Sequence, residues 1–234
     1  MAKKGQIKHF AACAIAGMSA LSAAAALSSC DISMEKEAGY TEGQLYAVEA
    51  EFSKIRIDAK GGIALSISYG GDFSVSYAES EQEKFTFSVE DETLVVVQRR
   101  TIGSLLDYKS KALNIVVPAA NKIASLTADI EGQIDCTLQG EYGLLSFDVD
   151  GDMKGSFSGS ADQLTIDCDG TLRFGSKRFA ADTVRIDYDG VLKFEVTCNA
   201  LLDVTCDGTY EGTYYGDCLL EKKGAGVGKI TKGE

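Results

Sequence analysis

Apolar and polar residues alternate with a period of two along most of the chain from about residue 44 onward. The clearest example is LTIDCDG (164–170), and related segments occur at 126–132, 145–151, 184–190 and 202–208. Successive side chains of a β-strand point to opposite faces, so this alternation predicts strands with one apolar face. Each segment ends in an acidic residue and a glycine, which is typical of a turn.

The glycines that end these segments recur every 18–20 residues, at positions 132, 151, 170, 190 and 208, with a degenerate sixth copy at Gly226. Counting from each glycine, apolar or small residues fall at the same offsets. The position six residues before the glycine holds Leu126, Leu145, Leu164, Val184 and Leu202. Such columns favour an all-β, single-stranded β-helix (solenoid) with coils of ~19 residues, in which like residues stack on like. The alternative is an antiparallel β-meander with Asp-Gly hairpin turns.

Residues 44–118 form a less regular β section before the repeats of 119–234. Alternation marks strands around Ile55 and Ile57, Leu65 and Ile67, and Val75 and Tyr77. The segment KFTFSVEDETLVVVQRR (84–100) predicts two more strands separated by an acidic turn. An irregular insertion, 101–112, contains Asp107, Lys109 and Lys111.

Residues 1–29 have the organisation of a secretory signal: a basic start, an alanine-rich apolar stretch and small residues before Cys30. The closing LSSC (27–30) resembles a bacterial lipobox, which predicts cleavage before Cys30 and attachment of lipid to its thiol. An uncleaved anchor helix is the alternative, because the apolar stretch is about long enough to span a bilayer. Residues 30–43 lack periodicity and are expected to be a tether.

The charge balance excludes several function classes. The chain has a net charge of −12, and removal of 1–29 with its three lysines changes this to −15 (20 basic and 35 acidic residues). Such a surface disfavours nucleic acid as a partner. The one histidine, His9, lies in the signal segment. Without an imidazole, Ser-His-Asp and Cys-His catalysis and typical catalytic zinc sites are excluded from the mature chain.

Outward-facing acids are expected to form two files along the repeats. Adjacent carboxylates about 4.8 Å apart repel by roughly 1 kcal/mol in water. They either keep the β-surface soluble and cap turns, or share a weak calcium site, since calcium prefers oxygen ligands. The calcium candidates are Asp148, Asp150, Asp167, Asp169, Asp187 and Asp189. No catalytic residue and no other cofactor is assigned.

The cysteines and tyrosines of the repeats are expected to be mainly core residues. Cys136, Cys168 and Cys206 fall in inward columns, where small thiols fill space. Cys198 with Cys218 is the first pair to test for a disulfide. The C-terminal tyrosines are predicted to pack inward, except that Tyr215 points outward.

The segments EFSKIRIDAKGGIALSISYG, FSVEDETLVV and LNIVVPAANKIASLTADIEGQI, followed by short glycine-ended repeats, resemble bacterial adhesin-like β-strand-repeat proteins. This is the auto-transporter adhesin group that includes the head GIN domain, and the resemblance spans about 45–234. It implies an exported or lipid-anchored right-handed β-solenoid and no catalytic residues. This chain departs from the group by having acid-Gly where many relatives have Ser-Gly or Asn-Gly.

Two functions follow. The first is a non-enzymatic, lipid-anchored envelope protein that binds a glycan or protein or acts as a scaffold, on the periplasmic face or cell surface of the outer membrane. The alternative is a carbohydrate-active β-helix lyase or hydrolase that uses aspartates, with or without calcium, and whose cleft would need the 101–112 insertion. A sensory accessory role is compatible with the same residues.

Overall fold

The computed structural model describes residues 44–48, 51–77, 85–99 and 110–234. The expected signal segment 1–29, the tether 30–43 with Cys30, and most of the 101–112 insertion lie outside the described residues. The described chain is all-β, and its strands belong to one curled 11-stranded sheet. None of the described residues forms a helix long and apolar enough to cross a membrane.

The strands follow one another along the chain in this order: β1 (Gln44–Ala47), β2 (Lys54–Lys60), β3 (Ile63–Gly70), β4 (Ser74–Tyr77), β5 (Phe85–Glu90), β6 (Thr93–Gln98), β7 (Lys111–Pro118), β8 (Ile123–Cys206), β9 (Thr209–Tyr215), β10 (Leu219–Lys223) and β11 (Val227–Lys232).

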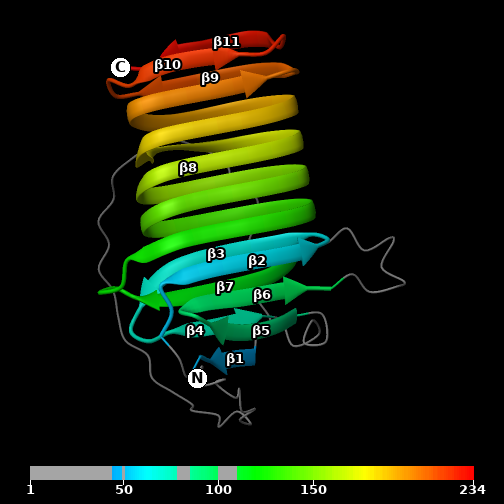
Figure 1. Ribbon diagram of the computed structural model, residues 1–234, viewed down its shortest axis with the longest axis vertical. Coiled ribbons are helices and arrows are strands. Elements are labelled where there is room, and N and C mark those ends of the chain that lie inside the picture. The colour runs from blue at the N-terminus through cyan, green and yellow to red at the C-terminus, as the bar shows by residue number, and fades with distance from the viewer. Residues whose placement is uncertain (1–43, 49–50, 78–84, 100–109) are drawn as a thin grey trace, which may run out of the picture.

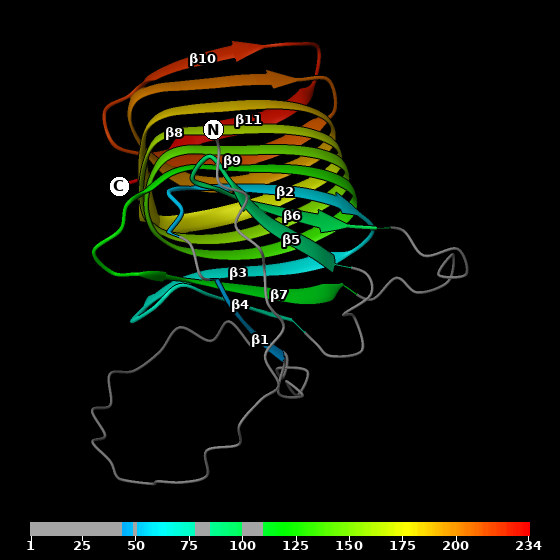
Figure 2. The same cartoon turned by 60° about the horizontal axis from the view of Figure 1, so that its bottom comes forward.

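Strand β8 is 84 residues long and winds repeatedly around the long axis of the molecule (Figure 1). We call each repeat of 18–20 residues a winding. The next strands continue in parallel register: Thr209 of β9 lies opposite Val191 of β8, and Val227 of β11 opposite Thr209. Strand β10 pairs in parallel with β8, with Leu219 opposite Leu201. In the tilted view of Figure 2, the windings have an elongated outline and lie one above the next.

The N-terminal strands stack in an order that differs from their order in the sequence. Strands β2 and β3 lie directly against the first winding of β8, with Ile55 opposite Leu126 and Leu65 opposite Cys136, all in parallel. On their other side, β6 pairs with β2 and β7 with β3, also in parallel. The β2–β3 winding is therefore enclosed between strands that follow it in the sequence.

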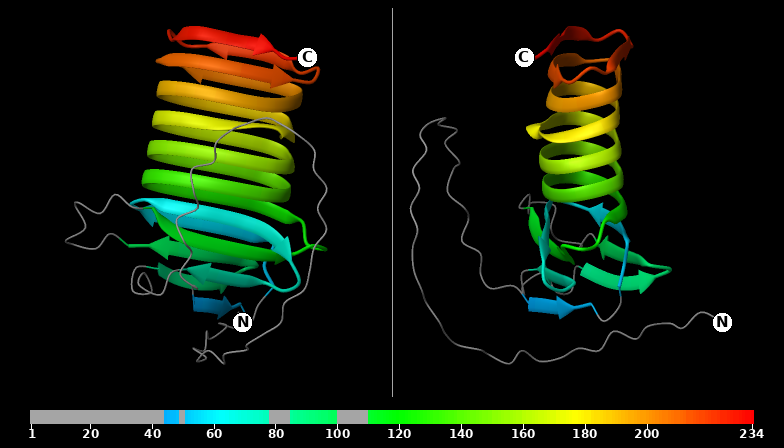
Figure 3. Two further views of the ribbon diagram at one scale, coloured as in Figure 1. Left: turned by 180° about the vertical axis from the view of Figure 1, so that it is seen from behind. Right: turned by 90° about the vertical axis from the view of Figure 1, so that its left-hand side faces the viewer.

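Antiparallel pairs join different strands at the N-terminal end of the stack, where β1 pairs with β4, β4 with β7 and β5 with β6. The expected acidic turn between β5 and β6 is present. Asp91 and Glu92 adopt positive φ angles of 48° and 60° there. The strands of this end and the C-terminal strands β10 and β11 lie at opposite ends of the long axis (Figure 3).

The inward columns form one continuous core. The column six residues before the glycines is entirely buried: Ile55, Leu126, Leu145, Leu164, Val184 and Leu202 are each at most 1% exposed. Another column, four residues after the glycines, contains both large and small residues. The rings of Phe174 and Phe194 stack with centroids 5.8 Å apart, and a side chain at Gly212 would collide with the Phe194 ring. The glycine thus makes room for the aromatic ring beneath it.

The glycines at the end of each repeat also form a column, and it begins one winding earlier than the sequence repeat suggested, at Gly61. A Cβ on Gly132 would lie 3.1 Å from the carbonyl carbon of Gly61. At Gly170 a Cβ would collide with the carbonyl oxygen of Gly151, and φ is +147°. Both the close stacking and the positive φ therefore require glycine at these corners.

We expect Gly170→Ala to destabilise the protein by about 2–3 kcal/mol, because the new Cβ meets backbone in a φ region that disfavours it. The matched control is Gly175→Ala, whose Cβ would make an ordinary contact of 3.4 Å with the Cβ of Glu195. Urea unfolding of both variants measures the difference. Equal midpoints for the two variants would contradict the close-stacking argument.

Candidate functional site

The outward acids of successive windings line up as two rows. The residues three before each column glycine form what we call the acidic row: Asp58, Asp129, Asp148, Asp167 and Asp187. Asp58 and Asp129 are direct neighbours in the β2–β8 register. The residues just before the glycines, Glu131, Asp150, Asp169, Asp189 and Asp207, form the second row and are all exposed. The expected two files of carboxylates are therefore present.

Asp167 lies within the acidic row, and its pKa responds to the charges around it. Partial burial raises the pKa of Asp167, and the neighbouring carboxylates Asp148, Asp187 and Asp169 raise it further. The acids are thus close enough to disfavour one another's ionisation. A salt bridge is formed at the N-terminal end of the second row, where Lys60 contacts Glu131 at 2.8 Å. Outside both rows, Lys223 contacts Asp203 at 3.1 Å.

The structure does not assemble the six calcium candidates into a coordination site. Within the described residues, no three or more carboxylate, thiol or imidazole groups surround a common point as metal ligands would. Asp148, Asp167 and Asp187 instead belong to successive windings and project outward side by side. One aspartate bonds to the next winding: Asp207 Oδ1 accepts a hydrogen bond from the backbone N–H of Ala225 at 2.8 Å.

A third outward row, three residues after each column glycine from Gly132 onward, contains both acidic and basic side chains, and we call it the mixed-charge row. It contains Asp135, Lys154, Arg173, Lys193, Glu211 and Lys229. Within the described chain, Lys193 pairs with Glu211 at 3.1 Å, whereas Lys154 and Arg173 have no ion-pair partner. The basic side chains of these rows therefore lie on one side of the glycine column, together with two acids, whereas the other side carries the two acidic rows. The sequence analysis did not single out this mixed-charge row, although the same counting from the glycines identifies it.

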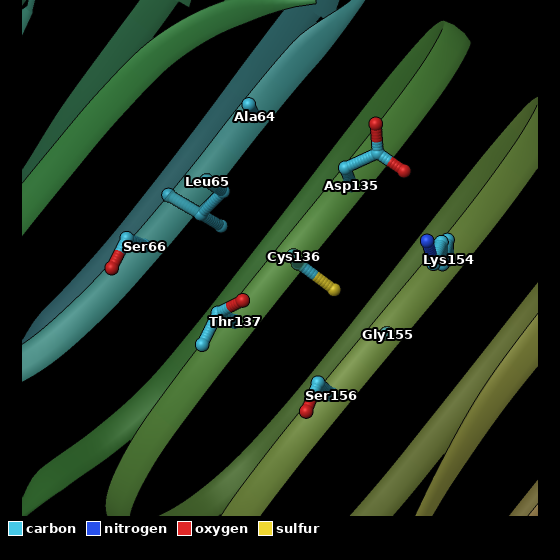
Figure 4. A pocket seen from close by; sticks show the side chains of 9 residues that line it. All are labelled: Ala64, Leu65, Ser66, Asp135, Cys136, Thr137, Lys154, Gly155 and Ser156. Carbon is cyan, nitrogen blue, oxygen red and sulfur yellow. The ribbon is translucent and has the colours of Figure 1, made fainter. Parts of the chain in front are cut away.

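A groove crosses three neighbouring strands at the beginning of this row. Its volume is about 380 Å³. One edge is Ala64, Asp135 and Lys154, and the other is Ser66, Thr137 and Ser156; the floor is formed at Leu65, Cys136 and Gly155 (Figure 4). We call this the hydroxyl groove.

Small side chains at Ala64, Ser66 and Ser156 leave room for the hydroxyl groove. Further along the axis, the column of Ala64 continues with Arg173 and Lys193, and the column of the serines continues with Gly175 and Glu195. The carboxylate of Asp135 accepts a hydrogen bond from Gln133 Nε2 at 3.4 Å, which orients it beside the exposed Lys154. The groove therefore offers a carboxylate, an ammonium group and three hydroxyls to a polar ligand.

The tyrosines and cysteines lie mainly where the sequence analysis placed them. Tyr210 is buried (6% exposed), and Tyr214 is half-buried against the core. Tyr215 points outward, where its hydroxyl donates to Glu195 at 2.7 Å and Lys177 lies 4.3 Å from the centroid of its ring. Cys136, Cys168, Cys198 and Cys206 are buried free thiols, and Cys218 is half-buried and free.

No family model and no curated protein matches the sequence. Among solved structures, a "putative adhesin" from Bacteroides fragilis matches with a TM-score of 0.50 at 17% identity, covering 81% of this chain and 95% of its own. Others named "putative adhesin" come from Parabacteroides distasonis (TM-score 0.42, 15% identity, 81% and 95% covered) and Parabacteroides merdae (0.41, 14%, 82% and 95%). At this identity, the likeness to the Bacteroides fragilis structure shows a shared all-β fold.

Because the pKa of Asp167 is raised, replacing this residue with a neutral one should increase the stability of the folded protein, and the increase should depend on pH. A raised folded-state pKa means that the ionised carboxylate disfavours folding once the pH exceeds that pKa, and that this cost disappears below the ordinary value of 3.8. Asp167→Asn should therefore stabilise the protein at pH 7 by about 0.5 kcal/mol after solvent screening, and by nothing near pH 3. Thermal unfolding at both pH values measures this gain.

Asp72→Asn, an exposed change outside both rows, is the control for that experiment. Millimolar calcium chloride, compared with sodium chloride of equal ionic strength, provides a further comparison. A loss of stability in Asp167→Asn at pH 7, together with a calcium-dependent rise in the wild-type melting temperature, would show instead that the carboxylate binds a cation.

Proposed function

We propose that this protein is a non-enzymatic binding protein of the bacterial cell envelope, anchored through lipid on Cys30 and built as a right-handed β-solenoid. The parallel registers of β8 with β9 and of β9 with β11 support a solenoid, as does the glycine column. The signal-like residues 1–29 and the LSSC segment support export and lipid attachment. We place the protein in the adhesin-like group of the head GIN domain on the residue pattern of 45–234.

The observation that carries the binding role is the regularity of the outward rows. Successive windings present carboxylates in the two acidic rows, and Lys154, Arg173 and Lys193 follow one another in the mixed-charge row, so the described surface carries strips of like charge. Strips of this kind fit an extended partner better than a small substrate, because the same contact can be repeated along the axis. The names of the structural neighbours are in keeping with adhesion.

We place the binding site for such a partner at the hydroxyl groove and propose that the partner is a glycan. Asp135, Lys154 and the hydroxyls of Ser66, Thr137 and Ser156 match the many hydroxyl groups of a sugar chain as hydrogen-bond donors and acceptors. The basic side chains of Arg173 and Lys193 continue from the groove along the axis and would favour an acidic glycan.

A glycan array probed with the purified protein tests this function. The double variant Asp135→Ala/Lys154→Ala should weaken binding about tenfold, equivalent to about 1.4 kcal/mol, since each change removes a charged hydrogen-bonding group. The control, Asp203→Ala/Lys223→Ala, removes an opposite-charge pair from another surface. Binding to no glycan, or equal binding by both double variants, would contradict the groove assignment.

The lipid anchor has a separate test. Cys30→Ser should abolish incorporation of a labelled fatty acid and move the protein from the membrane fraction to the soluble fraction. Mass spectrometry of the mature N-terminus measures both cleavage before residue 30 and the attached lipid. A wild-type protein that retains residues 1–29 would support the anchor-helix alternative.

A further inference from the structure

The last full winding brings two cysteines together. Thr197 at the end of one winding lies opposite Tyr215 at the end of the next. Gly216 then stacks directly on Cys198, because a Cβ on Gly216 would collide with the Cys198 carbonyl oxygen. The chain turns at Gly216, where φ is +90°, and Cys218 follows two residues later. Cys218 is thereby directed back toward the winding that contains Cys198.

The side chains of the two cysteines are neighbours at the edge of the core, and the Cys218 thiol contributes, after burial, to the raised pKa of Cys198. Cys198 Sγ donates to the backbone carbonyl oxygen of Asp182 at 3.6 Å. Cys198 is fully buried, whereas Cys218 packs against the edge of the core and remains half-exposed. One sulfur is therefore accessible to a reagent in solution, and the other lies directly behind it.

The other buried thiols of the described chain have different surroundings. Cys168 lies 3.6 Å from the carbonyl oxygen of Gly151, and its column continues through Tyr188 to Cys206, so an aromatic ring separates the two sulfurs. Cys136 lies at the floor of the hydroxyl groove several windings away. Neighbouring cysteine side chains within the described residues are thus a feature of Cys198 and Cys218.

We propose that Cys198 and Cys218 form a reversible disulfide that closes the last full winding onto the winding beneath it. Neighbouring strands and the turn at Gly216 already bring the sulfurs together, so bond formation requires rotation about the side-chain torsions and a small backbone adjustment. The bond would connect the ends of two successive windings and would exclude the terminal strands β10 and β11 from the closed ring.

The oxidant is a low-molecular-weight disulfide. The accessible Cys218 thiolate attacks one of its sulfur atoms, which forms a mixed disulfide and releases the first small thiolate. The Cys198 thiol then loses its proton and attacks Cys218 Sγ, which forms the internal bond and releases the second small thiolate. Two protein thiols lose two protons and two electrons, and the oxidant is reduced to two thiols. Burial and then the Cys218 thiol raise the pKa of Cys198 to about 12, so Cys198 is the second thiol to react.

The disulfide would join two successive windings near the C-terminal end of the stack. Strand β11 has β9 on one side, and within the described residues no winding covers its other side. Terminal repeats of a stacked protein fray first, because they bury only one interface. A bond between Cys198 and Cys218 would hold the last full winding in place when the windings beyond it open.

Peptide mapping of the oxidised protein tests the proposal. The full chain is reduced, freed of reductant, incubated with oxidised glutathione, and alkylated in denaturant without further reduction. Cleavage with trypsin and with a protease that cuts before aspartate separates the three cysteines of this region, since Asp203, Asp207 and Asp217 lie between or beside them. The expected product is residues 194–202 joined to residues 217–222.

Two variants make the result specific. Cys218→Ala should lose the linked peptide, and Cys206→Ala, a buried thiol of the same windings, should retain it. Oxidation should also slow protease cleavage within 199–217 by about tenfold in the wild type and leave Cys218→Ala unchanged. Alkylation of both Cys198 and Cys218, a glutathione adduct that persists on Cys218, or a Cys206–Cys218 link would each overturn the proposal.

Discussion

Parallel stacking of windings at strand spacing is the constraint on which the remaining structure depends. Each residue has a neighbour of the same column about 4.8 Å above and below, so a side chain must tolerate a close copy of its own environment. Apolar columns satisfy this by packing, as the buried leucines before the glycines do. Columns with less room need a compensating small residue, such as Gly212 beside the ring of Phe194. In the acidic row, stacking places like charges side by side. Partial burial raises the pKa of Asp167, and these neighbouring carboxylates raise it further.

The stacking also explains which parts of the fold could be predicted from the sequence. Columns are local and periodic, so counting from the glycines correctly placed the buried leucines, the core thiols and the outward Tyr215. The enclosed position of β2 and β3 could not be found in this way, because it depends on contacts between residues about 70 positions apart. Lys60 and Glu131, for example, are 71 residues apart and form an ion pair. The Lys60–Gly61 pair lacks the acid-glycine signature and was therefore not recognised as part of the glycine column.

The candidate site was less predictable than the fold for a related reason. The sequence analysis concentrated on the acids, because they repeat most visibly, and correctly placed them in outward rows. The hydroxyl groove depends instead on small residues, Ala64 and Gly155 among them, in windings whose neighbours carry larger ones. One small side chain in a periodic sequence does not indicate a groove. The groove becomes visible when neighbouring strands are aligned and their small residues are found side by side. The alignment also shows that the two acidic rows lie on one side of the glycine column and the mixed-charge row on the other.

The last described strands of the stack have a neighbouring winding on one side only, so their side chains must tolerate water on the other side. Lys222 occupies the column of Val204, an apolar position in the windings below, and its ammonium group lies 4.5 Å from the centroid of the Tyr210 ring. A lysine there covers the core with its aliphatic stem while its charge remains in water, and a charged edge discourages pairing with further strands. Leu219 and Val227 belong to outward columns near this end and are 62% and 77% exposed. Terminal windings bury one interface fewer than interior windings, so a covalent bond between Cys198 and Cys218 would act where the stack is least supported.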